Sequence, residues 1–368
     1  MKKQLKELAT LVNGYAFKSN NYCDTGIRII RIANVQDGYI SDESPCYYPL
    51  EFEQKLGSAI LRENDLLMSL TGNVGRVALL TKNFLPAGLN QRVECIRPFD
   101  KDMTEYLFYY FRSKVFADEV TSATTGCAQQ NLSIKWLEKH QIPIYHFEKQ
   151  KDIVNELKKI DKVIAIKKQQ LSSLNDLVKS RFIEMFVEKG FKEITFSDYA
   201  EIIDGDRGKN YPKAEEFSDE GYCLFLSAKN VTKDGFLFEQ MQFISEEKDN
   251  LLRKGKLCRG DIVITTRGTI GNIAFYDDDI PYDNVRINSG MVIIRQKEVS
   301  FNQIFFLNAF KNKIDEIKET NVTGAAQPQL PIHIMSKIKL LNPPIELQNE
   351  FADFVKLIDK SKFVCYLP

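Results

Sequence analysis

The stretch Leu61-Arg-Glu-Asn-Asp-Leu-Leu-Met-Ser-Leu-Thr-Gly-Asn-Val-Gly75 decides the organisation of this chain, because it occurs twice. It returns without a gap as Leu257-Cys-Arg-Gly-Asp-Ile-Val-Ile-Thr-Thr-Arg-Gly-Thr-Ile-Gly271. Later, Thr125-Gly-Cys-Ala-Gln-Gln-Asn-Leu-Ser-Ile134 returns as Thr323-Gly-Ala-Ala-Gln-Pro-Gln-Leu-Pro-Ile332. Solenoid repeats have periods of about 20–50 residues, and these copies lie much further apart. The sequence therefore indicates a duplicated domain, which suits a protein that reads two similar things at a fixed separation.

Length and composition are those of a globular protein with room for two domains. The chain has 368 residues, of which 43% are hydrophobic and 27% charged, as is usual for such proteins. No apolar run approaches the length of about 18–20 residues that a membrane span needs, and the N-terminus lacks a signal-peptide core. We expect a cytoplasmic protein whose 7 scattered cysteines are reduced thiols. The formal net charge is zero, so any DNA-binding surface must be a local patch.

Residues 1–146 form the expected first module, of mixed α/β (α+β) type. The apolar residues Leu5, Leu8, Ala9 and Val12 predict a short helix that ends at Gly14. Four β-rich runs then follow, at 27–32, 65–70, 77–80 and 93–96. Glycines 72 and 75 predict a turn between the second and third of these runs. An aromatic helix at 106–111, a glycine loop at 126, and a final helix and strand ending near residue 144 complete the module.

Residues 193–342 form the expected second module, which repeats this order. Phe196, Tyr199 and Ala200 match Leu5, Leu8 and Ala9, and Gly205 matches Gly14. The corresponding strands are expected at 224–228, 261–266, 272–276 and 291–295, and the aromatic helix at 304–310. We therefore expect the two modules to be structurally equivalent.

A long helix is predicted between the modules, within residues 147–192. Residues 148–187 contain no glycine or proline and are rich in helix-forming residues. Their apolar positions recur three, four or seven residues apart, which is typical of a coiled-coil-like stripe, although Lys167 and Arg181 interrupt it. The residues of the stripe are Ile153, Leu157, Ile160, Ile164, Leu171, Leu174, Val178 and Met185. Forty helical residues span roughly 60 Å, so this helix is also expected to act as a spacer.

The start of this helix is duplicated in residues 343–368, which are expected to form a shorter distal helix. The matched residues are Glu148, Gln150, Ile153, Ile160, Asp161 and Lys162 with Glu346, Gln348, Phe351, Ile358, Asp359 and Lys360. We expect the distal helix to end after Lys362 and to pack antiparallel against the central stripe through Phe351, Val355 and Ile358. This arrangement would give the duplication a pseudo-two-fold relation. Because the distal helix is short, part of the central stripe should stay exposed for a partner to cover.

The order of these motifs resembles that of the specificity subunit of type I restriction–modification systems. The order comprises an Asn-Gly-Tyr-Ala-Phe-Lys stretch at 13–18, a strand followed by a Thr-Gly-x-x-Gly turn, a Gly-x-Ala-Gln-x-x-Leu loop, a boundary marked by Pro, Glu and Gln, and a long helix. The resemblance covers essentially the whole chain. The distal helix departs from the family pattern, since it is usually about as long as the central one.

The resemblance implies a non-catalytic, DNA-binding protein built from two tandem target recognition domains. Each domain would read one half of a split DNA sequence, while the helices would set the distance between the halves and dock two methyltransferase subunits. Restriction subunits would join the complex. S-adenosylmethionine, ATP and Mg would be used by the complex, with no cofactor bound by this chain.

Candidate DNA-binding residues lie in the matched turns and loops, where the two copies differ. Side chains of these types read base edges or hold phosphates. In the first module they are Lys18, Asn73, Arg76 and Asn131; in the second they are Arg207, Lys209, Tyr211, Arg267, Thr269, Asn272 and Gln329. Gln129 and Gln327 are identical between the copies, which favours a structural role for that pair. For the glycines of the turns, a tight connection between strands is the favoured interpretation over a phosphate cradle.

Two other classes of protein are alternatives. Asn342-Pro-Pro-Ile345 resembles a motif of amino methyltransferases, but its aromatic residue is replaced by Ile345 and a glycine-rich cofactor loop is missing. Proline is also favoured near a helix start. Three dispersed histidines and no Cys-x-x-Cys pair disfavour a metal site. A free-standing DNA-modifying enzyme is therefore disfavoured, and a tandem-domain scaffold without a nucleic-acid role remains the second alternative.

Overall fold

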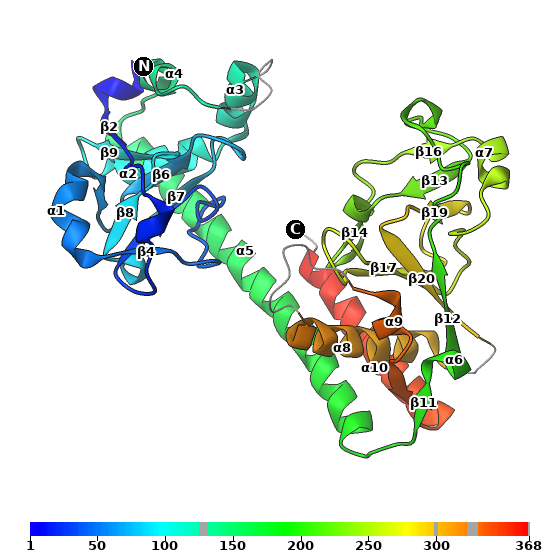
Figure 1. Cartoon of the computed structure of the whole chain (residues 1–368). Helices are drawn as coiled ribbons and strands as arrows, with labels where there is room; N and C mark the ends of the chain where they lie inside the picture. Colours follow the sequence, from blue (N-terminus) through cyan, green and yellow to red (C-terminus); the bar gives the residue numbers. More distant parts are fainter. Residues whose placement is uncertain (125–130, 298–300, 322–329, 367–368) are drawn as a thin grey trace. The chain divides into compact units, whose positions relative to one another are not determined.

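The computed structural model describes residues 1–124, 131–297, 301–321 and 330–366. The chain divides into two compact units, Met1–Ala165 and Ile166–Pro368. Figure 1 shows the elements of each unit and the long helix α5 (Phe147–Phe182), which contributes residues to both.

The first unit is built on a four-stranded antiparallel sheet with the strand order β2-β9-β6-β7. A second sheet has the order β4-β3-β8-β5, in which β3 and β8 run parallel, and β1 pairs with β10. The strands are β1 (Lys2–Gln4), β2 (Ala9–Asn13), β3 (Ile27–Ile30), β4 (Tyr47–Tyr48), β5 (Ile60–Leu61), β6 (Leu66–Ser69), β7 (Val77–Leu79), β8 (Ala87–Leu89), β9 (Val93–Pro98) and β10 (Gln141–Pro143).

Both faces of the four-stranded sheet are covered, because its side chains alternate between two cores. Leu66, Met68 and Ile96 face a core that includes the aromatic helix, while Leu67 and Cys95 face a core shared with the second sheet. The helices of this unit are α1 (Glu53–Leu56), α2 (Met103–Phe111), α3 (Lys114–Thr124) and α4 (Ile134–Lys139). The sheet edges that carry the loops are thereby held on a rigid support.

The second unit repeats the core of this topology, with three strands in its second sheet instead of four and an additional two-stranded sheet, β14-β15. Its four-stranded sheet has the order β12-β20-β17-β18, its second sheet has the order β16-β13-β19 with β13 and β19 parallel, and β11 pairs with β21. The strands are β11 (Glu193–Thr195), β12 (Ala200–Asp204), β13 (Cys223–Leu226), β14 (Val231–Thr232), β15 (Gly235–Phe236), β16 (Phe243–Ile244), β17 (Asp261–Thr265), β18 (Ile273–Tyr276), β19 (Val285–Ile287), β20 (Met291–Gln296) and β21 (Lys339–Leu341). The expected equivalence of the modules is confirmed.

The helices of the second unit differ from those of the first after the last strand of the four-stranded sheet. The single helix α8 follows the last sheet strand, where the first unit has α2 and α3. The helices are α6 (Phe196–Tyr199), α7 (Glu246–Leu251), α8 (Gln303–Asn321), α9 (Ile332–Met335) and α10 (Ile345–Tyr366). The Asn-Pro-Pro-Ile stretch stands at the start of α10, and Pro343 accepts a hydrogen bond from the buried Gln348 at 2.8 Å. Its interpretation as a helix start is confirmed.

The short helix predicted from Leu5 to Val12 is wrong. Leu5 lies in a 3-10 turn (Leu5–Glu7), and the strand β2 follows it, pairing with β9. Ala9 and Val12 face different cores, one on each side of the sheet. Residues three apart share a face in a helix but lie on opposite faces of a strand, so the same apolar spacing satisfies two cores here. The second unit has one helical turn, α6, before the equivalent strand β12.

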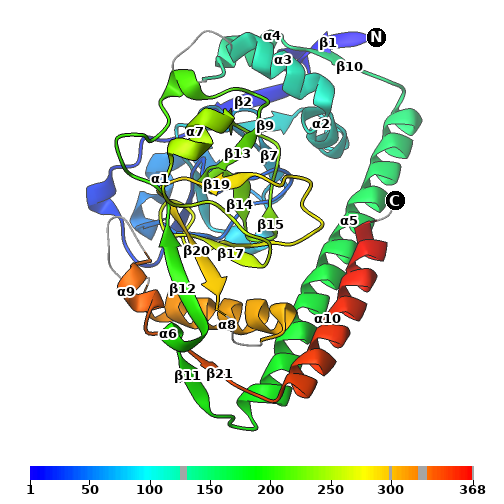
Figure 2. The same cartoon turned by 90° about the vertical axis from the view of Figure 1, so that its right-hand side faces the viewer.

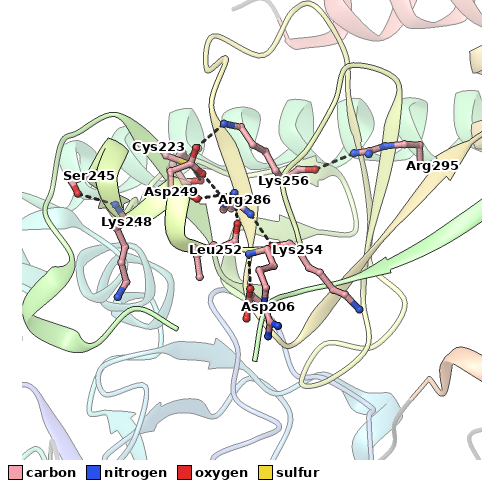
Figure 3. A network of polar contacts seen from close by, with 12 residues as sticks. Asp206, Cys223, Ser245, Lys248, Asp249, Leu252, Lys254, Lys256, Arg286 and Arg295 are labelled. Atoms are coloured by element: carbon pink, nitrogen blue, oxygen red, sulfur yellow. Dashed lines mark hydrogen bonds and ion pairs between the residues drawn. The ribbon is translucent and has the colours of Figure 1, made fainter. Parts of the chain in front are cut away.

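A buried charge network links the second sheet of the second unit to α7 (Figure 3). The carboxylate of Asp249 is fully buried and accepts hydrogen bonds from Arg286 Nε and from Lys256 Nζ, the latter at 2.6 Å. Arg286 also donates to the carbonyl oxygens of Lys254 (2.8 Å) and Leu252 (3.1 Å). Burial alone would raise the pKa of Asp249, but the bonds from Lys256 and Arg286 outweigh burial and lower that pKa.

The predicted central helix is confirmed as α5, which continues into a π-helical turn at Ile183–Val187. In the second unit, the C-terminal part of α5 packs against α10, and the two helices run in opposite directions (Figure 2). Arg181 near the end of α5 contacts Glu350 near the start of α10 at 3.3 Å, and the rings of Phe182 and Phe351 lie 5.5 Å apart. The antiparallel pairing is confirmed. The helix α10 continues to Tyr366, so its predicted end after Lys362 is wrong.

The stripe packs against α10 only in part, as expected from the shorter distal helix, and its N-terminal end packs in the first unit instead. From Leu174 onward, the residues Val178 and Met185 share a core with Phe351, Val355 and Ile358. At the other end, Ile153 belongs to the core of the first unit, because the first turns of α5 complete that core. Leu157 and Leu171 are half-buried. Ile160 and Ile164, at 54% and 46% exposed, confirm that part of the stripe stays uncovered.

Candidate nucleic-acid interface

The turn between β6 and β7 has the same construction as the turn between β17 and β18. In the first module, Ser69 Oγ donates to the carbonyl of Asn73 at 2.5 Å and accepts from Arg76 N at 3.1 Å. In the second module, Thr265 Oγ1 donates to the carbonyl of Thr269 and accepts from Asn272 N at 3.0 Å. Glycines 72, 75, 268 and 271 all have φ between 70° and 82°, a backbone conformation that residues with a Cβ rarely adopt. The predicted turn is confirmed in both modules.

Two further segments meet each turn at the same end of the sheet. A Cβ on Gly14 would lie 2.2 Å from the carbonyl of Asn90, and a Cβ on Gly205 would lie 2.2 Å from the carbonyl of Asn288. Only glycine allows this contact between the loop after the first sheet strand and the loop before the last one. Leu70 N also donates to the carbonyl of Arg92 at 3.1 Å, and the equivalent bond in the second module joins Thr266 and Gly290.

The segment that follows the glycine loop closes the same end. Leu132 N donates to the carbonyl of Leu70 at 2.8 Å, and Leu330 N donates to the carbonyl of Thr266 at 3.3 Å. Four separate stretches of each module therefore present their loop residues together, on a frame that the duplication repeats. Loops on a rigid support are where binding residues concentrate.

In the first module, three of these stretches and Ile32 line an open groove with a volume of about 770 Å³. Its apolar lining includes Ile32, Leu70, Leu132 and Ile134, and its polar lining comprises Thr71, Gln91, Arg92, Asn131, Ser133 and Lys135. Asn131 was predicted from the sequence, whereas Gln91, Arg92 and Lys135 were missed. They lie outside the repeated stretches 61–75 and 125–134, and the second copy has Ser289, Gly290 and His333 at the matching positions.

The other candidates of the first module differ in whether hydrogen bonds within the module hold their side chains. Arg76 Nη1 donates to Gln36 Oε1 at 2.6 Å. With the Asn73 amide turned so that its oxygen faces Arg76, that oxygen accepts from both terminal nitrogens at 3.2 Å. Arg76 is thus half-buried and held, while Asn73 is exposed in the turn. Lys18 is exposed in the loop after β2.

In the second module, three candidates have roles within the fold and four remain available or undescribed. Tyr211 packs its ring against Phe225 at 5.7 Å, and Asn272 Nδ2 donates to the carbonyl of Val231 at 3.0 Å. Arg207 contacts Asp204 at 3.1 Å while remaining exposed. The exposed candidates whose side chains have no hydrogen bond or ion pair to the described residues are Lys209, Arg267 and Thr269. Gln329, like Gln129 and Gln327, lies outside the described residues.

The loop after β12 owes its shape to a carboxylate. Asp206 accepts from the backbone nitrogens of Gly208 (2.7 Å) and Arg253 (2.8 Å). The bond from Gly208 is the main reason that the pKa of Asp206 lies below its ordinary value. The loop that carries Arg207 and Lys209 is therefore fixed by a charged group that stays ionised at neutral pH.

Glu94 is a buried carboxylic acid beside the groove segment of β9. Its side chain is 1% exposed, and neither carboxylate oxygen has a hydrogen-bond partner in the described part of the chain. Burial raises the pKa of Glu94 to about 8, with a smaller contribution from Glu138. The matching residue of the second copy is Val292. The side chain of Glu94 is therefore protonated at neutral pH, and the second module has no acid at the equivalent position.

We expect the Glu94→Val variant to be more stable than the wild type at alkaline pH. The folded pKa is raised, so stability is fully present below the unfolded value near 4.5 and is lost as the pH rises toward about 8. Between pH 6 and pH 9 the wild type should lose about 2–3 kcal/mol from this group, and the variant should not. Urea unfolding of the full chain at both pH values measures the difference. The exposed Glu63→Val variant is the control, and an equal pH dependence in wild type and Glu94→Val would contradict the assignment.

Metal binding and membrane insertion find no support in the described residues. Within them, groups of three or more His, Cys, Asp or Glu side chains that could hold a metal ion are absent. Over the same residues, every helix is too short or too polar to cross a bilayer.

The duplicated frame agrees with a comparison against known families. A family model described as the type I restriction modification DNA specificity domain matches residues 1–176 and again residues 188–363. The chain belongs to this family. Each match covers one module together with a helix, which is the unit that the internal repeat defines.

Several curated members of the family are similar to this chain. The type I restriction enzyme MjaVIII specificity subunit of Methanocaldococcus jannaschii is 30% identical over 172 residues, covering 45% of this chain and 40% of that protein. The MjaIX specificity subunit of the same organism is 24% identical over 332 residues, covering 84% and 75%. The EcoBI specificity subunit of Escherichia coli is 24% identical over 304 residues, covering 75% and 62%. The match to the MjaVIII protein thus spans well under two thirds of its length.

Solved structures of the family give long alignments at low identity. The S subunit of a type I restriction-modification system from M. genitalium aligns over 99% of this chain and 90% of its own, with 18% identity and a TM-score of 0.47. The HsdS subunit from Thermoanaerobacter tengcongensis aligns over 99% and 90%, with 15% identity and a TM-score of 0.39.

Proposed function

We propose that this chain gives a type I restriction–modification complex its DNA sequence specificity. Each module reads one half of a bipartite target in double-stranded DNA. The observation that carries the proposal is the repeated frame: both modules bring the same four stretches to one end of the sheet, yet fill them with different polar side chains. A repeated frame with different contacts suits two half-sites of different sequence. Family membership supports the same function.

The chain acts without chemistry of its own in this proposal. Two methyltransferase subunits modify adenine with S-adenosylmethionine, and restriction subunits use ATP and Mg. The exposed apolar residues of α5 support docking of a partner there. Ile160, Val163, Ile164 and Ile166 are each 45% to 54% exposed on a helix whose other residues are mostly polar, and covering such a patch is favourable.

The loop residues divide between two tasks. Lys18, Lys209 and Arg207 are exposed cations suited to phosphates, which position the protein on the duplex without reading sequence. Asn73, Thr269 and Arg267 are exposed in the turns and suited to base edges. Arg76, Tyr211 and Asn272 support these loops from within, since each has a partner in its own module.

Neither alternative function gains support. The Asn-Pro-Pro-Ile stretch is committed to the start of α10, where Pro343 is bound by a buried glutamine, so it is unsuited to holding a flipped base. A scaffold without a nucleic-acid role would not need different polar residues in the two repeated loop clusters.

Two measurements test the proposed function. Methylome sequencing of the host with and without this gene should show one bipartite motif that depends on it. The complex of this chain with its methyltransferase subunits should bind a duplex carrying that motif with an affinity that falls as salt rises, because phosphate contacts release counterions. An unchanged methylome together with salt-independent binding would exclude the proposed function.

A separation of tasks between the modules is also expected. Replacing Arg267 with Thr and Thr269 with Asn, the residues of the first copy, should change the bases read in one half of the motif only. Loss of a bidentate base contact costs about 1–3 kcal/mol of discrimination. Arg207→Ala should instead weaken binding without changing the motif. Methylome sequencing of each variant is the measurement, with Asn73→Thr as the counterpart for the other half. A change in both halves from the second-module variants would contradict this division.

A further inference from the structure

The groove of the first module has a charge arrangement that its sequence motifs did not reveal. Arg92 lies in the loop between β8 and β9, and Lys135 lies in α4, yet both line the same groove. Both side chains are exposed, and no ion pair to either is found among the described residues. Two cations from separate elements therefore line one groove, and no carboxylate of the described residues pairs with either of them.

Neutral polar groups share the groove with these cations. Gln91 and Asn131 line it and are exposed. The hydroxyl of Thr71 lies in the same lining and is buried without a hydrogen-bond partner in the described part of the chain. A buried hydroxyl without a partner is costly, so this group is available to a ligand. Amides and hydroxyls beside cations are the groups that contact base edges next to phosphates.

The second module places its cations on other elements. The matches of Arg92 and Lys135 are Gly290 and His333, so this pair of charges is missing there. Conversely, the matches of Arg267 and Arg207 in the first module are Thr71 and Ala16. Among the loop cations assigned to DNA contacts, Lys18 and Lys209 are the pair that stands at the same place in both copies. Each module thus has its own set of cations on a shared frame.

We propose that the groove lined by Arg92 and Lys135 is the surface with which the first module holds one strand of its half-site. Arg92 and Lys135 contact phosphates, while Gln91 and Asn131 contact base edges between them. The second module grips its half-site from other elements, through Arg207 and the turn residue Arg267. This inference rests on the proposed function and adds the surface, the residues and the difference between the modules.

The test uses the complex of the full chain with its methyltransferase subunits. The double variant Arg92→Gly/Lys135→His installs the residues of the second copy. The control Lys101→Gly removes an exposed cation from the turn after β9, at the opposite end of that strand from Arg92. The probes are a duplex carrying the motif found by methylome sequencing and a scrambled duplex of equal length. Binding is measured between 50 mM and 200 mM salt.

The double variant should weaken binding to both duplexes by about tenfold or more and lower the slope of log affinity against log salt by about 2, since each phosphate contact contributes about 0.9. Lys101→Gly should match the wild type. The variants Gln91→Ser and Asn131→Ala should change or relax bases in one half of the motif, while the other half shows that the second module still folds and reads.

Each outcome decides the inference. If the wild-type complex binds with a salt-dependent affinity but the double variant has the same slope, the groove is not the binding surface, and the proposed function stands. If Gln91→Ser and Asn131→Ala leave the motif unchanged, the groove holds phosphates without reading bases, which overturns that part. If the wild-type complex itself lacks salt-dependent binding and the methylome does not depend on the gene, the proposed function has failed.

Discussion

Replacing Asp249 with Ala should destabilise the second module by about 3–5 kcal/mol. Arg286 is 5% exposed, and its Nε donates to the Asp249 carboxylate, which is fully buried. Removing that carboxylate leaves a guanidinium charge in the core without a counterion (Figure 3). The bonds from Arg286 to the carbonyls of Lys254 and Leu252 solvate the cation only in part. Urea unfolding of the full chain should show the loss in the transition of the second module.

The control for this prediction is an acidic residue in an exposed ion pair. Asp283 contacts Arg259 at 2.8 Å, but its side chain is 93% exposed, so Asp283→Ala should cost about 0–1 kcal/mol. A double variant, Asp249→Ala/Arg286→Met, removes both charges and should be more stable than Asp249→Ala alone. If Asp249→Ala were as mild as Asp283→Ala, or if the double variant were the worse of the two, the penalty would not arise from the buried arginine.

The internal repeat made much of the fold predictable. Matched sequences must fold alike, so the strands around the turns at 72–75 and 268–271 could be placed before the structure was known, and the equivalence of the two sheets followed. The segment from Leu5 to Val12 could not be placed in the same way. Its spacing fits a helix with one apolar face, and it equally fits a strand that faces a core on each side. Only the presence of the second sheet decides between them.

The candidate site was predictable by position and not by residue. The repeat identifies loops that share a frame, and variation between copies indicates which side chains are not needed for that frame. Arg92 and Lys135 escaped this argument because they lie 43 residues apart in the chain. Their segments meet through Leu70, whose backbone bonds to both Arg92 and Leu132. Arg76 shows the opposite case, since a half-buried bond to Gln36 gives a polar turn residue a structural role.

Buried charges are the features that sequence patterns show least. Asp249 lies on a short helix, and Arg286 lies on a strand whose alternation would predict a half-exposed side chain. Glu94 stands in a run of apolar residues, and the second copy has Val292 at the matching position. In each case the free-energy cost of burying the charged side chain depends on which polar groups contact it. The Asp249 carboxylate accepts hydrogen bonds from Lys256 Nζ and Arg286 Nε, whereas the Glu94 carboxylate has no donor among the described residues. A buried carboxylic acid is therefore ionised in one module and protonated in the other.

Lengthening α5 should change the separation of the two half-sites without changing the bases read. Duplicating residues 163–169 adds two helical turns, about 10 Å at 1.5 Å per residue, and rotates the faces by only about 20°. The site lies beyond Asp161, which contacts Arg112 of the first module at 2.8 Å, and before Leu174, which packs in the core of the second. Both of these contacts therefore lie outside the duplicated segment.

The unread spacer of the methylated motif should therefore grow by about three base pairs, since base pairs stack about 3.4 Å apart. Methylome sequencing of the host carrying the variant is the measurement. The length-neutral exchange Lys168→Gln/Gln169→Lys keeps composition and charge and should leave the motif unaltered. New bases in either half-site, or an unchanged spacer in a variant that still methylates, would show that α5 does not set the distance. The exposed Ile160 lies on the N-terminal side of the duplicated segment, and the exposed Ile164 lies at its start. The variant keeps both residues. Loss of all methylation in a folded variant would mean that the partner subunits need the original helix length, which again contradicts a helix that acts as a tunable spacer.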